Sequence, residues 1–138
     1  MYFADHKYQN NSNDDLWINV GVMDPSTDKI NWFHKEKHDK GHIPTISLNQ
    51  DNYLMEVHRS NHDDHNLWYN LGKIKDDSTI TWCPMGDYRK YSSGTNPAVS
   101  LSGNTIFESH NSSTNMLWCT IGYLDTNQRF TFTLKNGK

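Results

Sequence analysis

A block of about fifty residues occurs three times in this sequence, so the fold has to be built from one unit used repeatedly. The block is clearest at residues 16–21, which read LWINVG. The same pattern returns as LWYNLG at residues 67–72 and as LWCTIG at residues 117–122, at offsets of 51 and 50 residues. We therefore interpret the chain as three tandem repeats.

Three further motifs recur in the same order with nearly the same spacing. They are Gly-x-x-Pro followed by Val/Ile-Ser-Leu, then Glu-x-His-x-Ser, and finally Ile-x-Trp, which becomes Phe-x-Phe in its last copy. A spacing of 52 residues also aligns His6 with His58 and His110, with Ala4 in the place of the glutamate. The motifs occupy residues 41–48 and 94–101, residues 56–60 and 108–112, and residues 30–32, 80–82 and 130–132.

Each motif is short, rich in β-branched and aromatic residues, and bounded by Gly, Asn, Asp, Ser or Pro, which is typical of strands and turns. No stretch shows the periodicity of a helix. The sequence therefore predicts an all-β fold of three tandem four-stranded repeats in one domain, approximately over residues 1–40, 41–93 and 94–138. The first repeat lacks its first strand, so eleven strands are expected.

Composition supports a folded chain and excludes several functions. Hydrophobic residues make up only 34% of the chain, but aromatic residues make up 12%, and disordered chains are poor in aromatics. The net charge is −3 and no basic run is present, so nucleic-acid binding is not expected. No apolar run approaches the ~20 residues of a membrane span, so no membrane insertion is expected.

Two features of the sequence bear on the location of the protein. The first residues do not resemble a signal peptide. Cys83 and Cys119 fall in non-equivalent strands, which argues against a disulfide framework. These features favour a cytoplasmic or non-classically secreted protein.

Alternation along the Leu-Trp motif separates an aliphatic face, expected to form the core, from a face that carries an indole and a polar side chain. The indoles on this second face belong to Trp17, Trp68 and Trp118. They are candidate platforms for sugar rings, whose hydroxyls the polar neighbours would bind. The alternative is that these indoles pack between repeats.

The pairs Glu56 with His58 and Glu108 with His110 each place a carboxylate and an imidazole on one face of a strand. Such groups must be hydrogen-bonded or meet solvent or ligand. One interpretation is a structural network between strands. The other is a hydroxyl-binding pair, in which the carboxylate accepts and the imidazole donates. His6 belongs to the same set, and the alanine in place of its glutamate predicts a weakened first site.

Two histidine-rich segments, residues 34–42 and 62–65, are expected to be solvated loops, because a zinc site needs three or four ligands in fixed geometry. We expect no metal and no cofactor. The chain has no His-Glu-x-x-His motif, nucleophile elbow or phosphate-binding loop. The notable residues also occur in copies, whereas a catalytic site is usually unique, so no enzyme is expected.

The motif set resembles a tandem repeat of about fifty residues found in β-propeller-like and lectin-like modules, over nearly the whole chain. The resemblance implies that each repeat is a four-stranded blade stacked radially on its neighbours. Three blades are fewer than the roughly 4–8 of known propellers, so a homodimer would complete a ring. A β-trefoil, which has three repeats of four strands in one closed domain, is the alternative.

Together these features predict a carbohydrate-binding protein, a small lectin with several related sites, one per repeat or per interface between repeats, and no catalysis. Its partners would be glycans or glycoconjugates, and linked sites would raise avidity by roughly 10²–10⁴. The alternative is a β-repeat scaffold for protein–protein interaction, and a third hypothesis is a metal-dependent enzyme using the loop histidines. The candidate ligand-binding residues are Glu56, His58, Trp68, Glu108, His110, Trp118, His6 and Trp17.

Overall fold

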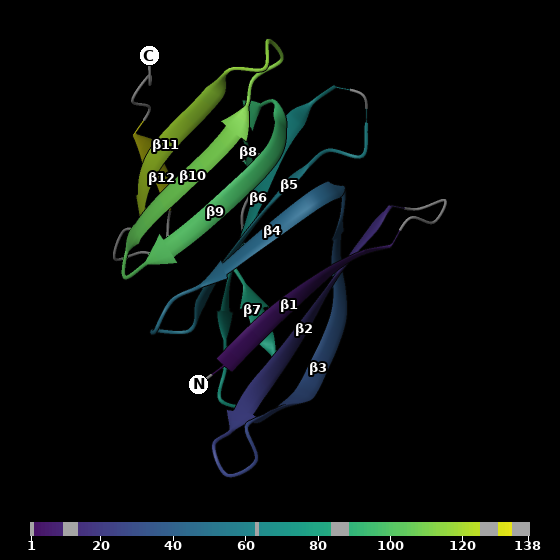
Figure 1. The fold of residues 1–138 in the computed structure, drawn as a ribbon, viewed down its shortest axis with the longest axis vertical. Helices are drawn as coiled ribbons and strands as arrows, with labels where there is room; N and C mark the ends of the chain where they lie inside the picture. The colour runs from purple at the N-terminus through teal and green to yellow at the C-terminus, as the bar shows by residue number, and fades with distance from the viewer. Residues whose placement is uncertain (1, 10–13, 63, 84–88, 125–129, 134–138) are drawn as a thin grey trace.

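The computed structural model describes residues 2–9, 14–62, 64–83, 89–124 and 130–133, which form twelve β-strands (Figure 1). In this part of the chain no helix is long and apolar enough to cross a membrane. The strands are β1 (Tyr2–Gln9), β2 (Asp15–Asp24), β3 (Lys29–Lys40), β4 (His42–Leu48), β5 (Tyr53–Arg59), β6 (Asn66–Ile74), β7 (Ile80–Trp82), β8 (Lys90–Ser93), β9 (Thr95–Ser102), β10 (Thr105–Asn111), β11 (Leu117–Leu124) and β12 (Phe130–Thr133).

The strands form three antiparallel sheets that follow one another along the chain, which confirms the all-β prediction. The first sheet has the order β1-β2-β3, the second β4-β5-β6-β7 with β8 also paired to β6, and the third β12-β11-β10-β9. Figure 1 shows the second sheet between the first and the third. Since β1 occupies the place of β5 and β10, the first sheet has no counterpart of β4 or β9 among the described residues.

The sheets lie against one another without closing on themselves. The first sheet contacts the second through β1 and β4, and the second contacts the third through β4, β5 and β9. Within the described ranges, the strands form neither a closed propeller ring nor a closed trefoil. The chain is therefore an open series of three sheets.

Apolar side chains form a core between facing sheets. One cluster joins the aliphatic face of the second sheet to the third sheet, and burying one such side chain contributes about 1.5–3 kcal/mol. In the first sheet, the matching aliphatic residues Leu16, Ile18 and Val20 are fully buried. The cluster consists of Met55, Val57, Tyr69 and Leu71 from the second sheet, and Leu101, Ile106 and Leu124 from the third.

The predicted aliphatic core face is confirmed in the first two repeats and wrong in the third. Leu117, the counterpart of Leu16 and Leu67, is 65% exposed. The physical reason is its position in the stack. The third sheet is the last one, and no described sheet lies on that side of it.

Part of the predicted histidine loop is strand, which corrects a sequence expectation. His34 and His38 lie in β3, and His42 begins β4. Although this segment has no apolar alternation, β3 stays hydrogen-bonded along β2 through two register shifts. The segment after β7 likewise forms β8 against β6. The described residues therefore form twelve strands, whereas eleven were expected for the chain.

The backbone register also corrects the alignment of the first repeat. Glu56 pairs with Asn70 across β5 and β6. The counterpart of Asn70 in the first repeat is Asn19, whose partner is Asp5 and not Ala4. The residue that takes the place of the glutamate is therefore an aspartate.

The same shift removes His6 from the set of equivalent histidines. His58 pairs with Trp68, and the counterpart of that tryptophan, Trp17, pairs with Lys7. His6 pairs one position away, with Ile18. The pairing across the two strands decides the alignment, so the spacing of 52 residues along the chain does not make His6 the equivalent of His58.

Candidate ligand site at the junction of the first two sheets

The site is built around two side chains of β5 that point to the same side of the second sheet. Glu56 and His58 are two residues apart on a strand, so they share a face. Their side chains are almost completely buried, with exposed fractions of 0% and 2% for the two residues. His58 Nδ1 lies 3.0 Å from Glu56 Oε1 and 3.1 Å from Oε2. The carboxylate therefore fixes the orientation of the imidazole ring.

The first sheet covers this pair with the last residues of β3. Asn70 Nδ2 donates to Glu56 Oε2 at 2.8 Å and to Asp39 Oδ2 at 2.9 Å, and so bridges the two sheets. His38 Nε2 lies 3.6 Å from the same Glu56 oxygen. Arg89 Nη1 donates to Asp39 Oδ2 at 2.8 Å. Each carboxylate at this junction therefore has polar partners.

The protonation of the buried pair follows from these contacts. Burial by itself would raise the pKa of Glu56, but the charges and hydrogen bonds of His58 and His38 hold it well below its usual value. Burial would likewise lower the pKa of His58, but the Glu56 carboxylate and the charge of Asp39 raise it. The structure thus favours a charged carboxylate and a charged imidazole side by side.

The third repeat contains the same pair in a different setting. His110 Nδ1 lies 3.0 Å from Glu108 Oε1, and both residues are buried. Tyr91 Oη donates to Glu108 Oε1 at 2.8 Å, and Ser92 Oγ lies 3.1 Å from His110 Nε2. Burial, and then the charge of Glu108, raise the pKa of Tyr91, which keeps its hydroxyl a donor.

The two junctions correspond residue by residue. Asp39 pairs with Leu16 in the first sheet, as Ser92 pairs with Leu67 in the second. Each of these segments reaches from one sheet onto the Glu-His pair of the next sheet. The two glutamates are 0% exposed and bonded to protein groups. A ligand therefore meets the imidazole edge and not the carboxylate.

A hollow of about 210 Å³ opens beside His58 at the first junction. At roughly 30 Å³ for one water molecule in the liquid, it has room for about seven waters or for one small ring-shaped ligand. The half-buried indole of Trp68 forms part of its wall. The remaining lining is polar and carries both charges. It is formed by Asp39, Lys40, Ser60, Asn61, His62 and Arg89.

Of the residues predicted from the sequence, His58 and Trp68 line this hollow and Glu56 lies behind the imidazole. Trp118 pairs with His110 across β10 and β11 at the second junction. Trp17 lies in the first sheet, where Lys35 Nζ is 5.1 Å from its ring centre. The predicted residues therefore lie in three places: at the hollow of the first junction, at the second junction, and in the first sheet.

Sequence reasoning missed Asp39 and Arg89, which complete the hollow. Asp39 stands two residues before Gly41, as Ser92 stands two residues before Gly94. The sequence shows this repeated position, but the polar residues around Asp39 predict a loop and not a strand that reaches the next sheet. No comparable pattern marks Arg89.

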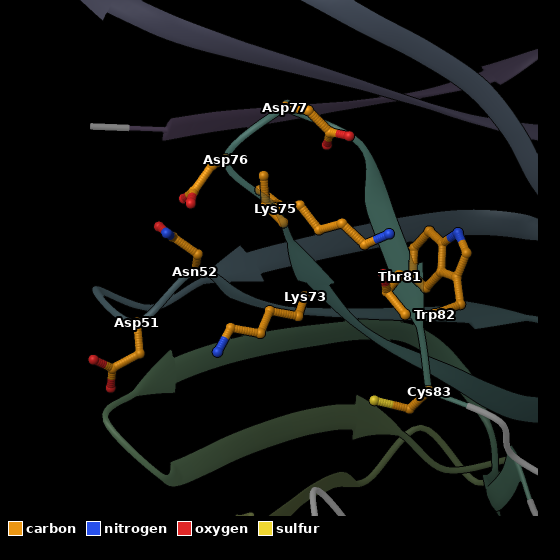
Figure 2. A pocket seen from close by; sticks show the side chains of 10 residues that line it. Asp51, Asn52, Lys73, Lys75, Asp76, Asp77, Thr81, Trp82 and Cys83 are labelled. Atoms are coloured by element: carbon orange, nitrogen blue, oxygen red, sulfur yellow. The ribbon is translucent and has the colours of Figure 1, made fainter.

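A larger hollow of about 860 Å³ lies elsewhere, beside the ends of β6 and β7 (Figure 2). Its wall includes Lys73, Lys75, Asp76 and the ring of Trp82. No Glu-His pair borders it, and its wall combines acidic and basic side chains. Among all the described residues, no group of three or more His, Cys, Asp or Glu side chains is placed to hold a metal ion.

Comparison with known proteins gives no relative for this chain. No protein-family model matches it, and neither does any curated protein or any solved structure.

Proposed function

We propose that this chain is a carbohydrate-binding protein without catalysis, and that it holds a sugar in the hollow between the first two sheets. The observation that carries the proposal is the half-buried indole of Trp68 in one wall with the imidazole of His58 and the carboxylate of Asp39 in the same hollow. A pyranose has an apolar face of C–H groups that packs on an indole. Its rim of hydroxyls needs both donors and acceptors.

His58 is well prepared for such a ligand. Glu56 occupies its Nδ1, so Nε2 is the ring nitrogen left for the hollow, where it lies 3.9 Å from Asp39 Oδ2. A hydroxyl between these two groups would accept from the imidazolium and donate to the carboxylate. Each such bond contributes only about 0.5–1.5 kcal/mol net, so single-site affinity would be weak.

The test is binding of the folded chain to a broad glycan array, followed by calorimetry with the best ligand. We expect Trp68→Ala to weaken binding about tenfold or more, since tenfold corresponds to about 1.4 kcal/mol. Phe33→Ala is the matched control, because Phe33 is 64% exposed and lies outside the lining of the hollow. A folded Trp68→Ala variant that binds like the wild type would contradict the site.

The architecture that fits this function best is the β-propeller blade. Support comes from three separate antiparallel sheets in chain order, two of them with four strands in sequential order. In this proposal the three sheets are part of a ring, which further blades complete by oligomerisation. The related positions Glu108, His110 and Trp118 would then belong to a second site, closed in this chain by Tyr91 and Ser92.

A protein–protein interaction scaffold is the second candidate. It is favoured by the exposed apolar side chains of the third sheet, where Phe107 is 46%, Leu117 65% and Tyr123 52% exposed. The glycan array separates the two functions. An absence of binding to every glycan would leave the scaffold as the function that the surface supports.

A further inference from the structure

Neighbouring sheets pack against each other in the same way at both junctions within this chain. At the first junction, the side of the first sheet that carries Glu36 and His38 meets the side of the second sheet that carries Glu56 and Trp82. At the second junction, the aliphatic side of the second sheet meets the side of the third sheet that carries Ile106. The second sheet thus has one side for the preceding sheet and one side for the following sheet.

The third sheet has no described neighbour on its following side. We call this side the tail face and define it by Phe107, Leu117, Cys119, Ile121 and Tyr123. In the backbone register Phe107 pairs with Ile121, as Met55 pairs with Leu71 in the second sheet. The second-sheet pair is buried in the core cluster, whereas Phe107, Leu117 and Tyr123 are exposed.

The first sheet has no described neighbour on its preceding side. We call this side the head face and define it by Trp17, Asn19, Gly21 and Trp32. Trp32 packs over Gly21, so close that a Cβ on this glycine would lie 2.9 Å from the indole. This indole is 50% exposed.

The second sheet shows what normally covers such an indole. Trp82 packs over Gly72 in the same way as Trp32 packs over Gly21. Its ring stacks on His38 of the first sheet at 5.0 Å, and its Nε1 donates to Glu36 at 2.7 Å. The head face is therefore a docking surface of the same type, and it lacks its neighbouring sheet.

The positions of the exposed apolar side chains lead to the same conclusion. Among the described residues, the large exposed hydrophobic side chains lie in or beside the first and third sheets, except Ile43 in β4. Large apolar side chains left exposed in this way mark candidate interaction surfaces. The members of the first and third sheets are Trp32, Phe33, Phe107, Met116, Leu117 and Tyr123.

We propose that two copies of this chain associate head to tail, with the tail face of each copy on the head face of the other. On the first and second sheets, the side equivalent to the tail face is covered by the next repeat of this chain. The tail face is the third side of this kind, so we expect a repeat from a second copy to cover it. Two copies contain six sheets, within the roughly 4–8 blades of closed propellers, whereas three copies would exceed that range. The proposal rests on the blade architecture but not on sugar binding.

The test is the mass of the 138-residue chain in solution, measured by sedimentation equilibrium. We expect twice the 16.1 kDa of one chain. Leu117→Glu on the tail face and Trp32→Glu on the head face should each halve the mass. Ile43→Asp is the matched control and should keep the double mass. Ile43 is 41% exposed with a backbone φ of 51°, a conformation that aspartate tolerates.

The outcomes separate this proposal from its alternatives. A wild type that sediments as one chain at ~100 μM overturns it, since typical stable interfaces bind more tightly than that. A tail-to-tail dimer would dissociate with Leu117→Glu but survive Trp32→Glu, which also overturns it. Phe107→Glu repeats the tail test should Leu117→Glu unfold. Sugar binding at Trp68 is measured separately, so its absence leaves the mass result unaffected.

Discussion

The buried pair of Glu56 and His58 is the most demanding feature of the molecule at the level of single residues. Two charges removed from water are stabilising only if their remaining hydrogen-bonding groups also find partners. Asn70 and His38 provide these partners for the carboxylate. Because His38 comes from another sheet, the pair is stable only when the first two sheets are together.

The pair predicts a specific dependence of stability on pH. The folded pKa of His58 is above its ordinary value of 6.5, so the native state binds more protons than the unfolded state just above that pH. The free energy of unfolding should therefore fall as the pH rises from 6.5 through the folded pKa. The loss amounts to about 1.4 kcal/mol for each unit by which the pKa is raised. The measurement is urea unfolding between pH 6 and 9.

Glu56→Gln tests the cause of this slope. Without the Glu56 carboxylate, burial and the charge of Arg89 lower the pKa of His58, and only the charge of Asp39 still raises it. The loss of stability with rising pH should therefore shrink or reverse. Asp77→Asn is the control. Asp77 lies exposed in a turn, and because its pKa is lowered, its titration affects the free energy of unfolding only at acidic pH. A wild-type slope retained in Glu56→Gln would contradict the assignment to this pair.

At the level of strands, the sequence predicted those elements whose side chains alternate between core and surface. Residues 16–20 and 67–71 show this alternation, and both lie in strands with a buried aliphatic face. The second half of β3 could not be predicted in this way. Its side chains, including His38 and Asp39, are polar because they reach the Glu-His pair of the next sheet and not an apolar core.

The candidate site was predictable only to the extent that it repeats. Trp68 and His58 belong to motifs found again in the third repeat, and they line the hollow. Arg89 has no repeated counterpart, and it reaches the hollow only through the packing of two sheets. The alignment of His6 was wrong because spacing along the chain does not determine pairing across strands.

The glycine that ends the Leu-Trp motif leaves room for side chains of the neighbouring strand, and Gly72 offers a test of this requirement. A Cβ there would lie 2.7 Å from Ile80 Cγ2 and 3.0 Å from Trp82 Cε3. Trp82 cannot move away freely, because it is stacked on His38. We expect Gly72→Ala to lower the free energy of unfolding by about 1–3 kcal/mol, as overpacking usually does.

Gly103→Asn is the comparison for Gly72→Ala. Gly103 has a φ of +52° and open space around its Cβ position, and asparagine adopts this conformation more readily than most residues. The substitution should therefore change stability by much less, as measured by thermal and urea unfolding. Equal losses at the two glycines would mean that the close packing of Trp82 does not restrict residue 72.

At the scale of the whole molecule, the chain is an open stack whose two end faces differ. A repeat protein gains stability from each junction between neighbouring units. The chain forms two such junctions by itself, and association of two copies would add two more at once. Both new junctions bury side chains of the same kind as the core, so they should resist salt better than an association based on charges.

This architecture predicts that thermal stability depends on protein concentration. A partner that binds only the folded chain shifts unfolding by mass action, so the melting temperature should rise with concentration. A tenfold increase adds about 1.4 kcal/mol to the stability of the pair, which corresponds to a few degrees for a chain of this size. In Leu117→Glu the melting temperature should be lower and independent of concentration, because the end faces no longer join. Scanning calorimetry over a hundredfold range of concentration measures both effects, and a wild-type melting temperature that stays constant would show that the open stack is stable without a second copy.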